Sequence, residues 1–219
     1  MYTLYIGNKN YSSWSLRAWV LMRGLGIPFA EKRIVLYRPG SPDRLREISP
    51  SGKVPCLHDG DVVVWDTLAI AEYLAERHRG VWPEDAGARA WARSVAAEMH
   101  AGFAHLREEM GMNVRVRTRK DPSPAVTADI ARILALWVEG RERFGAGGEF
   151  LCGPFGAVDA FWCPVAFRFR SYDVPLAGIA AAYARSLLEL PATRDWAAEA
   201  ERETERIPGL DPPELQAPQ

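Results

Sequence analysis

The chain has 219 residues, 48% hydrophobic and 25% charged, enough for one large or two modest globular domains with a buried core. Its net charge of −1 gives no global attraction to nucleic acid or membranes, and no apolar run approaches the ~20 residues that span a bilayer. Three cysteines without metal-ligand spacing, and four histidines that do not cluster with them, argue against a metal site and a disulfide framework. The small, odd number of cysteines favours a reducing, cytoplasmic environment.

The first third of the chain alternates between strand and helix patterns. Residues 2–6 are predicted to form a strand instead of a signal peptide, because a basic start and a long apolar core are missing. Apolar residues at helical spacing predict a helix over residues 12–25. Gly24, Gly26 and Pro28 are expected to terminate this helix. A second strand is expected over residues 29–36, followed by a loop with a short helical piece at 39–49.

Residues 51–74 carry the densest set of local signals. Val54 precedes Pro55, so it is restricted to extended conformations, and Pro55 can only begin or edge a strand. Asp59-Gly60 predicts a hairpin turn before a β-branched run. Asp66-Thr67 then predicts the start of a helix. A free backbone edge beside a helix N-terminus can hold a small peptide by its amides and carboxylates.

Strand patterns end at a Gly- and Pro-containing stretch near residues 80–87. Helices are expected over 89–110, 127–144, 157–170, 176–188 and 192–205, and an extended or loosely ordered tail over 208–219. The strand and helix order predicts an α/β thioredoxin-like domain over residues 1–80, a linker at 81–88 and an all-helical domain over 89–219.

The 51–74 unit resembles the N-terminal domain of glutathione transferases, in which a Val-Pro pair with a cis proline and an acid-plus-hydroxyl pair bind glutathione. The likeness extends over nearly the whole chain. It implies that the Val54 backbone pairs with the cysteinyl part while Pro55 sets the geometry. It also implies that Thr67 takes the γ-glutamyl carboxylate and that Asp66, in place of the usual Glu or Gln, faces the ammonium. Capping of the helix alone is the other interpretation of this pair.

The glycyl carboxylate of glutathione needs a cation. Lys53 is the first candidate and Arg38 the weaker one, with a solvated side chain as the alternative for Lys53.

Ser12 and Ser13 open the first predicted helix, and helix capping is the simplest interpretation of both. The stretch is also similar to the Ser-Ser-Cys-Ser-x-Arg motif of zeta-class enzymes, with Trp14 replacing the cysteine and Arg17 matching the arginine. The resemblance implies that Ser12 is the catalytic serine, with Ser13 in support.

A hydroxyl at a helix N-terminus can stabilise a thiolate. Lowering a thiol pKa by about two units takes ~2.7 kcal/mol, which one charge-assisted hydrogen bond and the helix terminus supply. Loss of the motif cysteine argues against maleylacetoacetate isomerisation.

A second substrate is expected against the first long helix of the helical domain. The candidate residues are Trp14, Met99, Phe103, Arg107 and Met110. Core packing explains the apolar members of this stripe equally well. Arg107 could bind an anionic acceptor or pair with Glu98 or Glu108.

The resemblance implies a cytoplasmic, homodimeric, serine-type glutathione transferase that adds glutathione to a small hydrophobic electrophile and needs no metal. The alternatives are a glutathione-dependent isomerase or peroxidase, and a non-catalytic ligand- or protein-binding member of the same fold.

Overall fold

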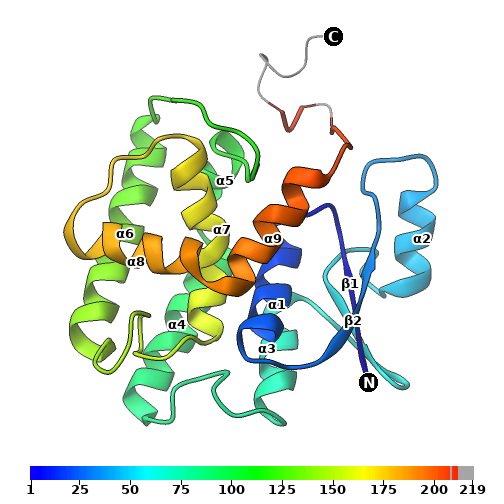
Figure 1. Cartoon of the computed structure of the whole chain (residues 1–219), viewed down its shortest axis with the longest axis horizontal. Helices are drawn as coiled ribbons and strands as arrows, with labels where there is room; N and C mark the ends of the chain where they lie inside the picture. Colours follow the sequence, from blue (N-terminus) through cyan, green and yellow to red (C-terminus); the bar gives the residue numbers. More distant parts are fainter. Residues whose placement is uncertain (208, 212–219) are drawn as a thin grey trace.

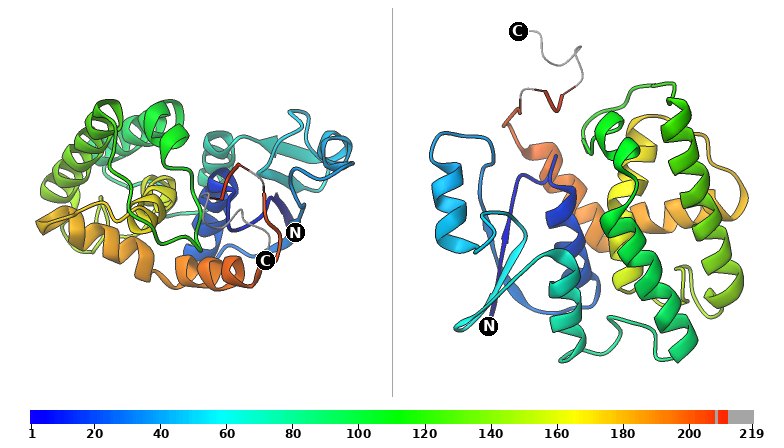
Figure 2. Two further views of the ribbon diagram at one scale, coloured as in Figure 1. Left: turned by 90° about the horizontal axis from the view of Figure 1, so that it is seen from above. Right: turned by 180° about the vertical axis from the view of Figure 1, so that it is seen from behind.

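The computed structural model describes residues 1–207 and 209–211, so most of the tail for which the sequence predicts loose order lies outside the described residues. Two lobes are visible, a sheet with its helices and a larger bundle of helices (Figures 1 and 2). The elements of the first lobe are β1 (Tyr2–Ile6), α1 (Ser13–Gly24), β2 (Phe29–Arg33), α2 (Ser41–Ile48), β3 (Cys56–Asp59), β4 (Val62–Trp65) and α3 (Thr67–Ala75).

The four strands form one mixed sheet in the order β2-β1-β3-β4. β1 pairs in parallel with β2 and antiparallel with β3, and β4 completes the hairpin predicted at Asp59-Gly60. α1 and α3 cover the face of the sheet toward the helical lobe, whereas α2 lies on the far side (Figure 1). This arrangement confirms the predicted thioredoxin-like fold, and it places α1 and α3 beside the second lobe (Figure 1).

The helical lobe contains α4 (Ala86–Ala101), α5 (Ala104–Glu109), α6 (Pro124–Phe144), α7 (Ala157–Ser171), α8 (Gly178–Glu189) and α9 (Pro191–Arg202). Every residue of α7 except Arg170 is buried, and α7 packs directly on α1. At its start, the Asp159 carboxylate accepts a hydrogen bond from the Gly156 amide at 3.0 Å and so caps the helix. α7 therefore joins the two lobes through one continuous apolar core.

The single helix expected over residues 89–110 is wrong, because the structure divides it into α4 and α5. Gly102 ends α4 by donating to the Glu98 carbonyl at 2.8 Å, and Phe103 has a φ of 59° in the left-handed region. Arg107 then donates its Nε to the Gly102 carbonyl at 2.9 Å, which satisfies a free carbonyl at the end of α4. The break turns α5 and the following loop toward the first lobe.

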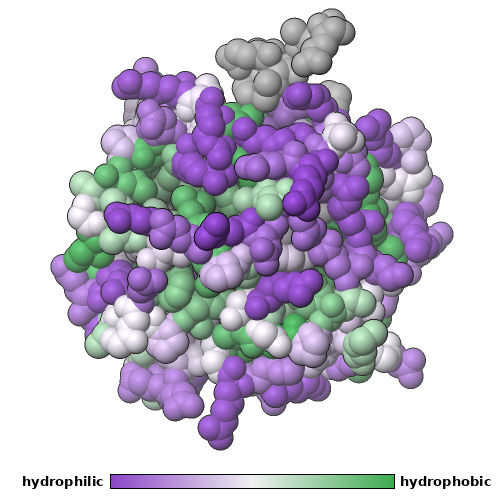
Figure 3. Space-filling view, in the orientation of Figure 1, coloured by the Kyte–Doolittle hydropathy of each residue, from purple (hydrophilic) through white to green (hydrophobic). Residues whose placement is uncertain are grey.

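Within the described residues, no helix is both long and apolar enough to cross a membrane. The face seen in Figure 3 carries mostly hydrophilic residues with apolar ones interspersed among them.

Candidate functional site

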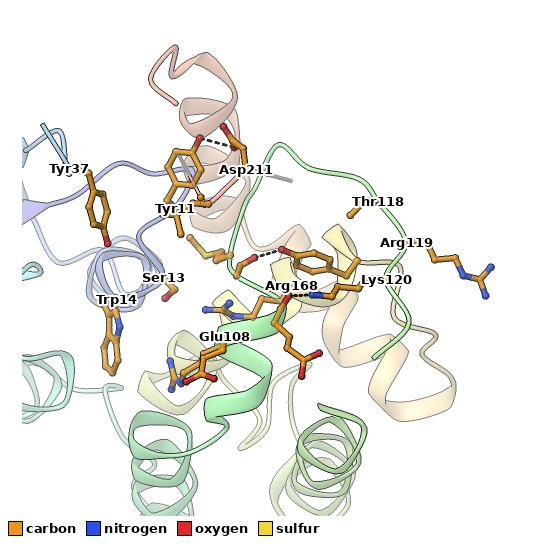
Figure 4. A pocket seen from close by; sticks show the side chains of 17 residues that line it. Tyr11, Ser13, Trp14, Tyr37, Glu108, Thr118, Arg119, Lys120, Arg168 and Asp211 are labelled. Carbon is orange, nitrogen blue, oxygen red and sulfur yellow. Dashed lines mark hydrogen bonds between the residues drawn. The ribbon is translucent and has the colours of Figure 1, made fainter. Parts of the chain in front are cut away.

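Two neighbouring cavities form a cleft between the lobes. One, of about 660 Å³, lies over the first lobe and includes Val54 in its lining. The other, of about 650 Å³, extends over the helical lobe and includes Arg168. Both are lined by Tyr11, Ser13 and Trp14, so the start of α1 forms the wall that they share. In Figure 4, Ser13 and Trp14 face Arg168 and Glu108 across the second cavity.

The two serines differ in their hydrogen bonds. Ser12 caps α1, because its Oγ accepts from the Ser15 amide at 3.4 Å and donates to the Ser15 Oγ at 2.7 Å. The Ser13 hydroxyl lies at the first helical position and makes no hydrogen bond to any described residue. Ser13 is therefore the hydroxyl that has a proton to offer to a ligand at the helix N-terminus.

Val54 and Pro55 lie just before β3, and their peptide bond is cis. The amide and carbonyl of Val54 make no hydrogen bond to described residues, so the backbone edge is open to a ligand. Lys53 and Arg38, both exposed, line the same cavity as Val54. The structure thus brings these three predicted residues into one cavity with Ser12 and Ser13.

Asp66 and Thr67 begin α3 in the same lobe. Asp66 has a φ of 74°, a conformation that side-chain-bearing residues rarely adopt, and its carboxylate accepts from the Leu68 amide at 2.9 Å. Thr67 is buried, and its own amide has no partner among the described residues. The pair therefore offers a free amide and a half-exposed carboxylate at a helix N-terminus, which suits a zwitterionic group.

His100, from α4, reaches this pair and was missed by sequence reasoning. Its Nε2 lies 3.4 Å from Asp66 Oδ2, and its Nδ1 lies 3.4 Å from Thr67 Oγ1. The ring also packs edge-on against Trp14, with centroids 5.1 Å apart. Burial lowers the pKa of His100, with Arg17 and Arg107 adding to this and Asp66 opposing it. No spacing in the sequence connects residue 100 with residues 66 and 67.

Three arginines gather behind and beside the second cavity. Arg17 is 1% exposed and stacks on Trp14, and none of its three side-chain nitrogens has a hydrogen-bond partner in the part of the chain that the structure describes. The hydrogen bonds of Arg107 and Arg168 all go to backbone carbonyls, and neither forms an ion pair with a described carboxylate. Burial lowers the pKa of Arg168 to about 10, and Arg107 contributes further. Arg107 and Arg168 therefore bring positive charge to this half of the cleft, whose lining also includes the carboxylates of Glu108, Glu109 and Asp211.

The structure contradicts part of the predicted acceptor site. Met99 and Met110 have no exposed surface and Phe103 is 8% exposed against Trp162, so all three belong to the core and not to the cleft. The three residues do not form one helical stripe, because the chain breaks between α4 and α5; Met99 is buried where α4 packs on α7. Trp14 and Arg107 do line the second cavity. Arg107 pairs with neither Glu98 nor Glu108; Glu98 pairs instead with Arg132.

Among the described residues, no group of histidine, cysteine or carboxylate side chains is arranged to hold a metal ion.

Comparison with known proteins identifies the first lobe. Residues 11–77 match the family model for the N-terminal domain of glutathione S-transferase. A probable maleylacetoacetate isomerase of Caenorhabditis elegans is 30% identical over 105 residues, 47% of this chain and 48% of the worm protein. Mouse glutathione S-transferase theta-3 is 29% identical over 89 residues, 39% of this chain and 37% of the mouse protein. This chain thus spans less than half the length of either relative.

Solved structures match over much more of the chain. A glutathione transferase homologue from Burkholderia, solved with bound glutathione, has a TM-score of 0.67 at 21% identity and covers 91% of this chain and 97% of its own. A bacterial zeta-class maleyl pyruvate isomerase has a TM-score of 0.66 at 21% identity, and the match covers 93% of this chain and 100% of that protein's chain. At this identity the likeness shows the shared fold.

Proposed function

Because residues 11–77 match the model for the glutathione S-transferase N-terminal domain and the chain has the fold of glutathione transferases, we propose that the protein is a serine-type glutathione transferase. Residues 1–80 bind glutathione, residues 81–88 connect the two parts, and residues 89–219 hold an electrophile. The observation that carries the proposal is the cavity that Val54 shares with the two α1 serines. The Asp66-Thr67 pair lines neither cavity and is connected to this wall through His100, which packs against Trp14.

Glutathione lies along the first-lobe cavity in this proposal. The cysteinyl part of glutathione pairs with the open Val54 backbone. The carboxylate of the γ-glutamyl part binds at the free Thr67 amide, and Asp66 holds the ammonium of the same part. The glycyl carboxylate meets Lys53, with Arg38 as the second cation nearby. Both charged ends of the tripeptide would then have partners of opposite charge.

The thiolate is stabilised by Ser13. Sequence similarity ranks Ser12 first, but the Ser12 hydroxyl is used in the α1 cap, which leaves Ser13 to donate to sulfur. A charge-assisted hydrogen bond contributes roughly 1.5–3 kcal/mol and the helix terminus roughly 0.3–1 kcal/mol more. The thiolate then attacks an electrophilic carbon, and a leaving group such as halide departs with its bonding electron pair, so no general base is required.

The electrophile is a small molecule with an apolar body and an anionic group. Trp14 offers the body an aromatic face. Arg107 and Arg168 supply positive charge, since neither forms an ion pair with a described carboxylate. The positive charge of Arg107 and Arg168 also favours a second candidate function, glutathione-dependent isomerisation of an unsaturated carboxylate. The relatives named as isomerases give a precedent for this reaction. Formation of a stable adduct distinguishes transfer from isomerisation.

The test measures glutathione binding by calorimetry and turnover with an aryl halide. Asp66→Asn removes the negative charge opposite the ammonium but keeps an amide oxygen that can cap α3, and it is expected to weaken binding about tenfold or more. Ser13→Ala is expected to retain binding and lose turnover by about 10²-fold, as for removal of one donor to a developing anion. Tight binding of apolar ligands without turnover of any electrophile would instead identify a non-catalytic binder.

A homodimer in the cytoplasm completes the proposal. Sedimentation of the purified chain at micromolar concentration tests the first part, and fractionation of cells that express it tests the second.

A further inference from the structure

The loop before α1, residues 7–12, is buried over its whole length although it is rich in polar residues. This segment, called the serine loop here, carries Asn8, Lys9 and Asn10 and places Ser12 and Ser13 at the cleft. Buried polar backbone must find hydrogen-bond partners. The identity of those partners decides what holds the catalytic hydroxyls in place.

Glu203, in the segment after α9, supplies two of the partners. Its Oε1 accepts from the Lys9 amide at 2.7 Å, and its Oε2 accepts from the Asn10 amide at 3.0 Å. Both carboxylate oxygens are thus used on two consecutive amides of the serine loop. The side chain is 5% exposed and pairs with Arg33 at 2.9 Å, which compensates its charge.

Two backbone carbonyls of the serine loop accept hydrogen bonds from the helical lobe. The Lys9 carbonyl accepts from Trp196 Nε1 at 2.9 Å, and the Asn10 carbonyl accepts from the Val114 amide at 3.1 Å. Arg115 binds the Glu203 carbonyl and donates to the Tyr11 hydroxyl at 2.9 Å. The serine loop is therefore shaped by contacts from outside the first lobe.

We infer that Glu203 is a positioning residue that sets the place of the Ser13 hydroxyl through the Lys9 and Asn10 amides. This inference rests on the proposed function. A misplacement of about 1 Å caused by a substitution away from the reacting atoms can cost an enzyme about 10²-fold in rate. Attachment of α9 to the first lobe does not depend on Glu203, because Lys9 Nζ pairs with Glu31 and Glu199 and Trp196 packs on Trp19.

Glu203→Gln tests the inference at constant side-chain size. One of its two acceptor oxygens becomes an NH₂ group, which faces a backbone N–H that it cannot satisfy. The matched control is Glu205→Gln in the same segment, which removes a carboxylate paired with Arg33 at 2.9 Å but touches no group of the serine loop with its side chain. Both variants are compared with the parent in glutathione affinity, kcat, and the pKa of bound glutathione from thiolate absorbance.

The expected result is a kcat at least tenfold lower and a raised pKa of the bound thiol in Glu203→Gln, with glutathione affinity within threefold of the control. Glu203→Asp keeps a carboxylate for the ion pair with Arg33 and is expected to show a smaller loss of kcat. This second variant also tests the inference if Glu203→Gln fails to fold. Equal kcat and thiol pKa in the two Gln variants would overturn the inference. A parent without glutathione turnover would overturn the proposed function, and this inference with it.

Discussion

Ser12 Oγ donates its hydrogen bond to Ser15 Oγ at 2.7 Å, and Ser15 Oγ also accepts from the Gly7 amide at 3.0 Å. This chain of hydroxyls ties the first turn of α1 to the end of β1. It makes Ser12 a structural residue of the helix start, next to a hydroxyl that has no partner among the described residues.

Ser12→Ala is therefore expected to lower the free energy of unfolding by about 1 kcal/mol, the usual effect of losing an N-cap. The loss of kcat should be smaller than in Ser13→Ala, which should leave stability nearly unchanged. Urea unfolding and turnover of both variants check this prediction. A larger loss of kcat in Ser12→Ala would return the catalytic role to Ser12.

Arg17→Met is expected to stabilise the protein by about 1–4 kcal/mol, because replacing buried, uncompensated charge with an apolar side chain of similar length relieves its desolvation cost. Burial, Arg107 and Arg168 all lower the pKa of Arg17, which shows that this environment disfavours the charge. Arg23→Met, on the exposed side of the same helix, is the control and should stay within about 0.5 kcal/mol of the parent. Destabilisation of Arg17→Met beyond the control would show that the stacking on Trp14 outweighs the burial cost.

His100 gives a pH dependence of stability with a defined sign. Its pKa is lowered in the folded state, so the unfolded chain binds the proton more readily. The stability that the neutral His100 contributes is fully present above the pKa of His100 in the unfolded chain, near ~6.5. It is lost as the pH falls through the pKa of His100 in the folded protein. His100→Gln should therefore show a shallower loss of stability below pH ~6.5 than the parent, as measured by urea unfolding between neutral and mildly acidic pH. His105→Gln, at an exposed position, is the control; a slope equal to that of the parent in His100→Gln would contradict the prediction.

Arg168→Met should discriminate between acceptors by charge. A hydrogen bond to a charged group contributes roughly 1.5–3 kcal/mol, so kcat/KM for a carboxylate-bearing acceptor is expected to fall about ten- to hundredfold. A neutral acceptor of the same reactive type should change by less than about threefold. Arg119 lines the same cavity but is exposed, so Arg119→Met should have a smaller effect. Equal losses for both acceptors would rule out an anion-binding role for Arg168.

The cysteines are expected to be unreactive in the native protein. Burial raises the pKa of Cys163 and of Cys152 to about 12, and it also raises that of Cys56. Since the thiolate is the reactive form, iodoacetamide at mildly alkaline pH should label these residues far more slowly in the native protein than after unfolding in urea. Mass spectrometry of the labelled chain measures the rates. Fast native labelling of Cys56 would show that its strand opens readily.

The local elements were largely predictable, because their signals lie within a few residues of one another. The hairpin at Asp59-Gly60, the cap at Asp66 and the cis Val54–Pro55 bond, which came from the family resemblance, all agree with the structure. The exception is the break at Gly102, where a left-handed Phe103 overrides a periodic pattern that continues through it.

Side-chain roles in the cleft depended on contacts between residues distant in sequence. Periodicity predicted that Met99 and Met110 share one helical face, but the chain breaks between them, and only the packed structure shows that both are core. In the same way, the spare hydroxyl of Ser13 became evident only from hydrogen-bond distances within the folded helix start.

The sequence by itself determined the order of strands and helices, the peptide-sized edge at Val54 and the pair of serines at a helix start, because hydrophobic periodicity, proline and capping chemistry act locally. Only the tertiary structure decided which serine is free, brought His100 to Asp66, gathered three arginines at the cleft and set Glu203 against the serine loop. Hydrogen bonds and charges act over a few ångströms, and the distance between residues 9 and 203 is determined only once the whole core has packed.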